Sequence, residues 1–186
     1  MKLDCSWEKD GFRMRPARME EAERCYEQNF NPLDPETARM TGCKAAFSRE
    51  EVLSFFRSAV ESPDCCLFLV FAPDGRMIGE SVINEIDFAL RCANFRIAIY
   101  RPAERGRGIG SWMVQTTRDF AFEVLKLHRL SLDVFSFNTQ AEQVYRKAGF
   151  QREGVLRDAV LDGGQYADDI LMSMLEEDWK RLKGLL

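Results

Sequence analysis

Residues 101–110 (RPAERGRGIG) constrain the fold of this chain more than any other stretch. The apolar run at residues 95–100 before them predicts a buried strand, and residues 111–127 after them have the spacing of an amphipathic helix. Glycines between a strand and a helix let successive amides point at one ligand, and the helix N-terminus adds about half a positive charge. Arg105 and Arg107 add whole charges. The segment therefore predicts a binding site for an anion such as phosphate.

The hydrophobic pattern around this segment predicts one mixed sheet with helices on its faces. Strands are expected at residues 12–16 (an edge strand), 66–71, 77–88, 95–100, 130–137, 150–161 and 165–175. Helices are expected at residues 20–30, 48–62, 111–127, 139–147 and 176–183. Turns are expected at residues 73–75, 90–94 and 162–164. Arg118 is expected on the exposed side of the helix at residues 111–127. The strand–loop–helix–strand section implies a right-handed parallel crossover, so we predict an α/β (α+β) fold in a single domain over residues 1–186.

Length and composition limit the class of protein. The chain has 186 residues, of which 46% are hydrophobic and 30% charged, as is typical of one soluble globular domain. A net charge of −4 argues against nucleic-acid binding, and no apolar run approaches the ~20 residues of a membrane span. Six cysteines without a CxxC motif, a single histidine and a polar N-terminus argue against a metal site and a signal peptide. We therefore expect a reduced, cytoplasmic protein with no nucleic-acid or membrane partner.

Two further residues are expected near the glycine segment. Asn138 follows the strand at residues 130–137, and open α/β sheets bind ligands at such carboxyl ends of strands. Tyr145 lies two turns into the next helix, which a capping box starting at Thr139 is expected to open. Each residue has a structural alternative, because Asn138 is a good helix cap and a tyrosine ring fills a core well.

Together these residues resemble the two signatures of the GNAT acetyltransferase family. The pattern R-x-x-G-x-G at residues 105–110 resembles its acyl-CoA pyrophosphate motif. The pattern N-x-x-A-x-x-x-Y-x-x-x-G-F at residues 138–150 resembles its second signature. The resemblance covers residues 78 to about 175, and residues 164–172 resemble the branch that acetylates ribosomal-protein N-termini or spermidine.

The resemblance implies a GNAT-type sheet, mostly antiparallel, whose parallel fourth and fifth strands splay around acyl-CoA. Loop amides would hold the pyrophosphate, pantetheine would pair with the fourth strand near residues 97–100, and an amide there would polarise the thioester, an effect worth ~3 kcal/mol. Asn138 would fix the geometry of the cofactor. The implied cofactor-binding residues are Ile97, Ala98, Ile99, Arg105, Gly106, Arg107, Gly108, Ile109, Gly110, Ser111, Asn138, Ala141 and Tyr145.

The resemblance also implies transfer of the acetyl group of acetyl-CoA to a primary amine by direct attack, without a metal. Tyr145 would protonate the departing thiolate, since a phenol and a thiol of this kind have similar pKa values. The base is open, because residues 94–100 contain no acid where many family members place a glutamate. We predict Glu85, with Glu80 and Asp87 as other candidates and a water relay as an equal alternative.

The acceptor amine cannot be read from the sequence. A protein N-terminus, a polyamine, an aminoglycoside and another small amine all fit. Contacts with the acceptor are expected from residues 30–47 and the terminal hairpin, with acids at 34, 36, 168 and 169 as candidates to attract it. One alternative function is a non-catalytic acyl-CoA-binding or sensing module of the same fold, and another is nucleotide-phosphate binding without CoA. The presence of both Asn138 and Tyr145 favours the enzyme. Family members are often dimers, which makes a homodimer a further hypothesis.

Overall fold

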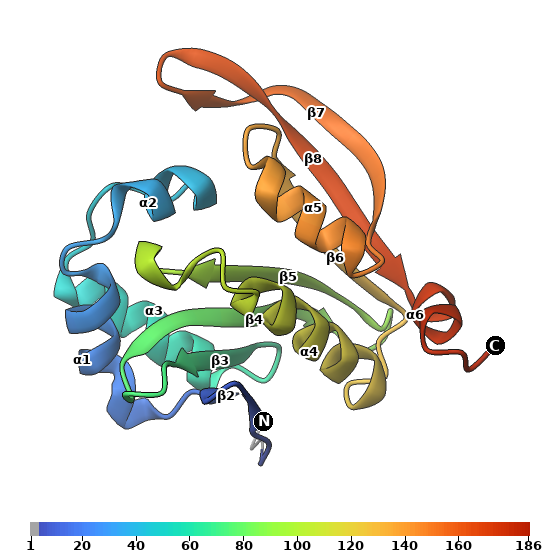
Figure 1. Ribbon diagram of the computed structural model, residues 1–186, viewed down its shortest axis with the longest axis horizontal. Coiled ribbons are helices and arrows are strands. Elements are labelled where there is room, and N and C mark those ends of the chain that lie inside the picture. The colour runs from blue at the N-terminus through green and yellow to red at the C-terminus, as the bar shows by residue number, and fades with distance from the viewer. Residues whose placement is uncertain (1–3) are drawn as a thin grey trace.

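The computed structural model describes residues 4–186, and its strands form one eight-stranded sheet in the order β1-β2-β3-β4-β5-β6-β8-β7 (Figure 1). The strands are β1 (Trp7–Lys9), β2 (Phe12–Pro16), β3 (Cys66–Phe71), β4 (Met77–Asp87), β5 (Cys92–Ile99), β6 (Arg129–Phe135), β7 (Gln151–Asp162) and β8 (Gln165–Leu175). The α-helices are α1 (Ala22–Cys25), α2 (Pro35–Thr41), α3 (Arg49–Glu61), α4 (Ile109–Glu123), α5 (Thr139–Lys147) and α6 (Glu176–Leu182). Short 3₁₀ turns lie at Met19–Glu21 and Pro102–Glu104, and a π-helical turn at Tyr26–Phe30 continues α1.

The pairing of the strands confirms the predicted fold class. Neighbouring strands are antiparallel except for β5 and β6, which are parallel and joined through α4. These two strands pair only from Cys92↔Arg129 to Asn94↔Ser131 and then separate. Beyond that point β6 continues along β8 as far as Phe135, whereas β5 runs on to Ile99 without a partner on this side. The sheet is therefore split at its parallel pair.

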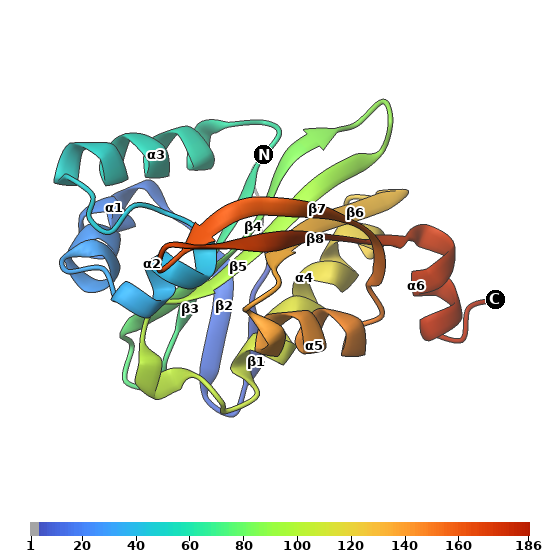
Figure 2. The ribbon, with the colours of Figure 1, turned by 90° about the horizontal axis from the view of Figure 1, so that it is seen from above.

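Helices cover both faces of the sheet, with α1 and α3 on one face and α4 and α5 on the other (Figure 2). Each face has its own hydrophobic cluster, represented by Phe56 of α3 on the first and Met113 of α4 on the second. β3 contributes to both clusters, and every residue of it is buried. This position explains why residues 66–71 read as a continuous apolar run rather than an alternating one.

Three local predictions are wrong. Residues 12–16 do not form an edge strand, because β1 pairs along their outer side; β1 is only three residues long and has no apolar pattern. β5 begins at Cys92, inside the predicted turn at 90–94. Arg118, which was expected to be exposed, is buried; its guanidinium donates to the Ala148 carbonyl at 2.6 Å and lies 2.7 Å from Asp119. Hydrophobic periodicity cannot detect a buried arginine whose guanidinium is bound by the adjacent Asp119 and by a carbonyl 30 residues along the chain.

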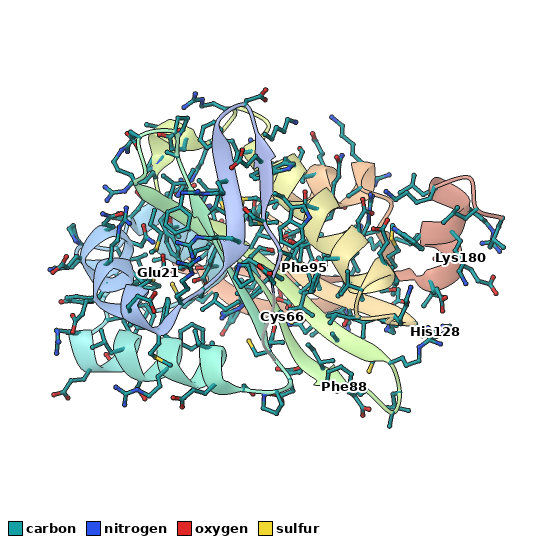
Figure 3. The ribbon with its side chains drawn as sticks, turned by 90° about the horizontal axis from the view of Figure 1, so that it is seen from below. Glu21, Cys66, Phe88, Phe95, His128 and Lys180 are labelled. Carbon is teal, nitrogen blue, oxygen red and sulfur yellow. The ribbon has the colours of Figure 1, made fainter. Side chains whose placement is uncertain are left out.

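The structure also shows where the cysteines and the histidine lie. All six cysteines are free thiols. Burial raises the pKa of Cys66 to about 12 and that of Cys25 further, so these two thiols stay protonated. His128 is exposed at the start of β6, away from the centre of the molecule where Phe95 lies (Figure 3). Between residues 4 and 186 no helix has both the length and the apolar character needed to cross a lipid bilayer.

Candidate active site

A cleft of about 960 Å³ opens where β5 and β6 separate. Its walls come from β5, the loop before α4, the start of α5, and the helices α2 and α3. A cavity of this size lies in the range of small-molecule and cofactor sites. The predicted anion-binding segment and the predicted Asn138 and Tyr145 therefore meet at one place.

The glycine loop borders open space at Gly106 and Gly108. Gly106 and Gly108 have φ angles of 74° and 78°, a left-handed backbone that favours glycine, and a Cβ added at either would meet nothing within 4 Å. The first helical hydrogen bond of α4 runs from the Trp112 amide to the Gly108 carbonyl at 3.1 Å. The amides of residues 109–111 therefore have no partner within the helix and can bind an anion at its positive end.

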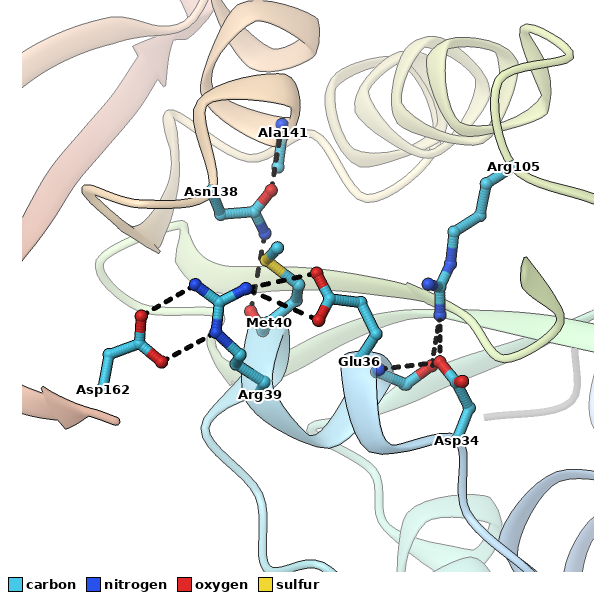
Figure 4. Close-up of polar contacts among 9 residues, drawn as sticks. Asp34, Glu36, Arg39, Met40, Arg105, Asn138, Ala141 and Asp162 are labelled. Atoms are coloured by element: carbon cyan, nitrogen blue, oxygen red, sulfur yellow. Dashed lines mark hydrogen bonds and ion pairs between the residues drawn. The ribbon is translucent and has the colours of Figure 1, made fainter. Parts of the chain in front are cut away.

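The two arginines of this loop do not supply the free positive charges that the sequence predicted. The Arg105 guanidinium donates to Asp34 Oδ2 at 2.7 Å (Figure 4). It also donates to the Ile99 carbonyl at 3.1 Å. Arg107 donates to Glu104 Oε2 at 2.5 Å. Asp34 is far from Arg105 in the sequence, and Glu104 is buried in the turn Pro102–Glu104. The motif at residues 105–110 contains neither carboxylate, so it does not reveal these ion pairs. Attraction for an anion therefore rests mainly on the backbone amides and the end of α4.

Asn138 caps α5 and also contacts the N-terminal part of the protein. Its side-chain oxygen accepts from the Ala141 amide at 3.2 Å, and its Nδ2 donates to the Met40 carbonyl at 3.5 Å (Figure 4). The helix cap is thus Asn138 rather than Thr139 as the predicted capping box had it. The structural alternative that the sequence left open for Asn138 is realised, and the residue lines the cleft as well.

α2 forms a bridge over the cleft between the glycine loop and the β7–β8 hairpin. Asp34 caps its N-terminus and binds Arg105 of the loop. At its other end Arg39 binds both carboxylate oxygens of Asp162 at 2.7 Å, at the tip of the hairpin (Figure 4). Because its contacts come from loops without a motif, the sequence did not predict this bridge.

Tyr145 lines the cleft, and its ring belongs to the hydrophobic core. It is 6% exposed and packs edge-on against Phe95 and Phe150, with ring centroids 6.3 and 6.0 Å away. Burial raises the pKa of its hydroxyl well above the usual value, and the negative charge of Asp133 adds to the shift. The phenol therefore keeps its proton at neutral pH and can donate it to a leaving group.

Most of the predicted cofactor-binding residues line the cleft. These are Ile97, Ala98, Ile99, Arg105, Gly106, Gly108, Gly110, Ser111, Asn138, Ala141 and Tyr145. The two others face elsewhere. Arg107 is exposed and held by Glu104, and Ile109 is 4% exposed because the first turn of α4 directs it into the core.

The structure does not bring the predicted base, Glu85, to the cleft. Glu85 is exposed, has a φ of 55°, and lies in the irregular stretch between the Asn84 and Asp87 pairings of β4. Glu80 on the same strand does line the cleft and is 6% exposed. Burial raises its pKa, although nearby Arg96 and a hydrogen bond from the Tyr100 hydroxyl oppose the shift. The strand irregularity at Glu85 cannot be located from the sequence alternation alone.

Alternating side chains of β5 divide the cleft into two sides. Phe95, Ile97 and Ile99 pack with the cluster under α4 and α5, which contains Tyr145. Ala98 and Tyr100 pack instead with residues of the N-terminal helices, the face that Glu80 shares. The glycine loop and Tyr145 thus belong to one side, and Glu80 belongs to the other.

Phe30 and Phe47 line the cleft and belong to the segment 30–47 from which acceptor contacts are expected. Three other aromatic residues of the cleft have no counterpart in the prediction: Phe55, Phe135 and Phe137. Of the four acids expected to attract an amine, Glu36 lines the cleft, whereas Asp34, Asp168 and Asp169 do not. Within residues 4–186 no group of three or more metal-ligating side chains could hold a metal ion.

The sequence of this chain is similar to those of known acetyltransferases. The model of the acetyltransferase (GNAT) domain matches residues 12–151, which is most of the chain. Spermidine N(1)-acetyltransferase of Escherichia coli K12 is 34% identical over 106 residues, which cover 57% of this chain and 56% of that protein. The match thus spans little more than half the length of this relative. An uncharacterised N-acetyltransferase of Bacillus subtilis, YokL, is 26% identical over 81% of this chain and 85% of its own length.

Solved structures show the same fold. The spermidine N-acetyltransferase of Vibrio cholerae, crystallised with CoA and spermine, superposes with a TM-score of 0.80 at 23% identity. The alignment covers 92% of this chain and 99% of that one. The extent of the family match, together with the shared fold, establishes that this chain belongs to the GNAT acetyltransferase family.

Proposed function

We propose that this protein is an enzyme that transfers the acetyl group of acetyl-CoA to a primary amine. The observation that carries the proposal is the split of β5 from β6. It leaves one cleft with free helix-terminal amides at one end, a buried phenol on one side and a buried carboxylate on the other. These are a phosphate cradle, an acid and a base, which are the parts that amine acetylation by a thioester requires.

On the donor side, the chain's own backbone would bind the cofactor. The amides of the glycine loop and of the first turn of α4 would bind the pyrophosphate. The edge of β5 beyond Asn94, which has no partner strand there, would pair with the pantetheine arm. An amide among residues 97–99 would then donate to the thioester oxygen. Such a donor strengthens its bond as negative charge develops, which lowers the barrier by about 3 kcal/mol.

On the acceptor side, Glu80 replaces Glu85 as our candidate base. Glu80 would take a proton from the ammonium group, directly or through a water relay, and the neutral amine nitrogen would attack the carbonyl carbon. The carbon–sulfur bond then breaks, and Tyr145 gives its proton to the departing thiolate. The nitrogen, which carries an extra proton after the attack, releases it to water, and the Tyr145 phenolate regains a proton from water. The raised pKa values of both groups suit these roles, since the carboxyl becomes a stronger base and the phenol stays protonated.

Steady-state kinetics of thiol release with a panel of primary amines, with mass analysis of the products, test this proposal. We expect Tyr145→Phe to lower kcat about 100-fold or more while the Kd for acetyl-CoA stays unchanged. Tyr166→Phe is the matched control, because Tyr166 is 73% exposed on the hairpin and should leave kcat unchanged. Wild-type kcat in Tyr145→Phe would remove the proposed acid.

The alternative function, a non-catalytic acyl-CoA-binding module, predicts a different result in the same assay. The wild-type protein would bind CoA and yet release no thiol with any amine. Stabilisation by ATP rather than by CoA would instead support nucleotide-phosphate binding.

Location and assembly belong to the proposal as well. We propose a cytoplasmic enzyme that self-associates as a homodimer. Apolar side chains exposed on the hairpin, including Leu156 and Leu161 at 50% and 66%, offer a surface for such a contact. Sedimentation velocity would test the assembly, and a monomer at all concentrations would contradict it.

A further inference from the structure

The acceptor side of the cleft has an aromatic wall. Phe30 lies between Phe47 and Tyr100, with ring centroids 5.5 and 5.1 Å away, and all three residues line the cleft. α3 extends this wall with Val52 and with Phe55, which is 43% exposed. Partly exposed aromatic rings that line a cavity favour a ligand with apolar surface, because contact with it removes both surfaces from water.

Most carboxylates near this wall already have cationic partners. The pairs are Glu36–Arg39, Glu51–Lys44 and Asp34–Arg105. In each pair the positive charge lies beside the carboxylate and offsets its attraction for a second cation. A polyamine carries several ammonium groups along one chain, and here the outer ones would meet carboxylates that already have cationic partners, although Glu36 shares Arg39 with Asp162.

Negative charge at the gap between β5 and β6 comes from Asp133 of β6, which lines the cleft without an ion-pair partner among the described residues. Glu80 is buried across the gap on β4, where nearby Arg96 favours its ionised form although burial opposes it. The charge of Asp133 also raises the pKa of Asp169 on the adjacent strand β8, and Asp169 Oδ1 is buried with no hydrogen-bond partner among the described residues. One ammonium group is therefore attracted to the gap, next to the position proposed for the thioester.

We infer that the preferred acceptor is a primary amine with a single positive charge on an aromatic or bulky apolar body, rather than a polyamine. This inference rests on the proposed acetyl transfer and names the substrate class of the same site. The ammonium group lies at the gap near Glu80, and the apolar body lies against Phe30, Phe47 and Phe55.

Three amines, compared at the same concentration of acetyl-CoA, separate the effect of the ammonium charge from the effect of the apolar body. We would measure kcat/KM by thiol release for 2-phenylethylamine, for n-propylamine, which lacks the ring, and for spermidine. The value for 2-phenylethylamine is expected to be at least about tenfold higher than either of the others, which corresponds to about 1.4 kcal/mol. Equal values, or a preference for spermidine, would overturn the inference and leave acetyl transfer intact. Thiol release with none of the amines would contradict the proposed function itself.

A substitution in the aromatic wall tests whether the wall binds the aromatic ring of the amine. Phe47 lies in the loop before α3 and is partly exposed, so Phe47→Ala should fold. It is expected to lower kcat/KM for 2-phenylethylamine about tenfold, mainly through KM, and to leave n-propylamine and the Kd for acetyl-CoA nearly unchanged. Phe88→Ala is the matched control, since Phe88 is 55% exposed in the β4–β5 turn, at the edge of the molecule (Figure 3). Equal losses for both amines in Phe47→Ala would show that the wall does not recognise the apolar body.

Discussion

A single methyl group at Gly108 separates the binding role of the glycine loop from its role in folding. Gly108 caps α4 with a φ of 78°, and a Cβ there would point into open space with no protein atom within 4 Å. Gly108→Ala therefore costs only the strain of a left-handed backbone, about 1–2 kcal/mol of the free energy of unfolding. For a chain of this length such a loss lowers Tm by about 2–8 °C.

The effect on the cofactor should be larger and specific. The methyl group would occupy the space through which a phosphate approaches the loop amides, so at least one charge-assisted hydrogen bond would be lost. Such a bond contributes about 1.5–3 kcal/mol, which weakens CoA binding about 10- to 150-fold. Isothermal titration calorimetry with CoA would measure the Kd, and thermal unfolding would measure Tm.

Gly75→Ala provides the matched control. Gly75 has a φ of 84°, also has no atom within 4 Å of an added Cβ, and lies in the β3–β4 turn outside the cleft. It should lose a similar amount of stability and keep the wild-type Kd for CoA. An unchanged Kd in Gly108→Ala, or an equal increase in both variants, would refute the phosphate cradle.

Two further predictions concern buried charges. Glu80→Gln should abolish most of the activity and, with it, the rise of kcat/KM with pH that follows deprotonation of this carboxyl. Because burial places the folded-state pKa of Glu80 above its unfolded value, the wild-type protein should lose stability as pH rises through that folded-state pKa. Denaturant unfolding at several pH values should show that this loss disappears in Glu80→Gln, and an unchanged slope would argue against a raised pKa. Arg118→Ala should lower the free energy of unfolding by about 2–3 kcal/mol because it leaves the Ala148 carbonyl without its donor, whereas a loss below 0.5 kcal/mol, the usual limit for surface substitutions, would show that water replaces the guanidinium.

The sequence predicted the donor side of the site far better than the acceptor side. The glycine loop, Asn138 and Tyr145 lie within elements whose order and period are local properties of the chain, and the parallel crossover brings them together. Acceptor contacts were expected from residues 30–47, and Phe30 and Phe47 do line the cleft. Their packing into an aromatic wall could not be predicted, because this segment has no motif and reaches the cleft only through tertiary packing.

The errors within the site have related causes. The sequence shows that Arg105 is charged, but only the folded chain shows that Asp34, far away in sequence, binds it. Strand alternation gave Glu80 and Glu85 opposite faces, but it could not say which face borders the cleft or that the strand loses its register beyond Asn84. The first strand, β1, was missed because three residues are too few for a periodic signal.

We propose that the acetyl group passes directly from acetyl-CoA to an amine within the split between β5 and β6. Mass spectrometry with acetyl-CoA carrying an isotope-labelled acetyl group distinguishes direct transfer from transfer through an acetylated protein. We expect the label on the nitrogen of the amine, and no gain of mass in the intact protein incubated with acetyl-CoA alone. A labelled protein that forms before the amine is added and passes its label on would contradict direct attack, and the absence of label on any amine would contradict the enzyme.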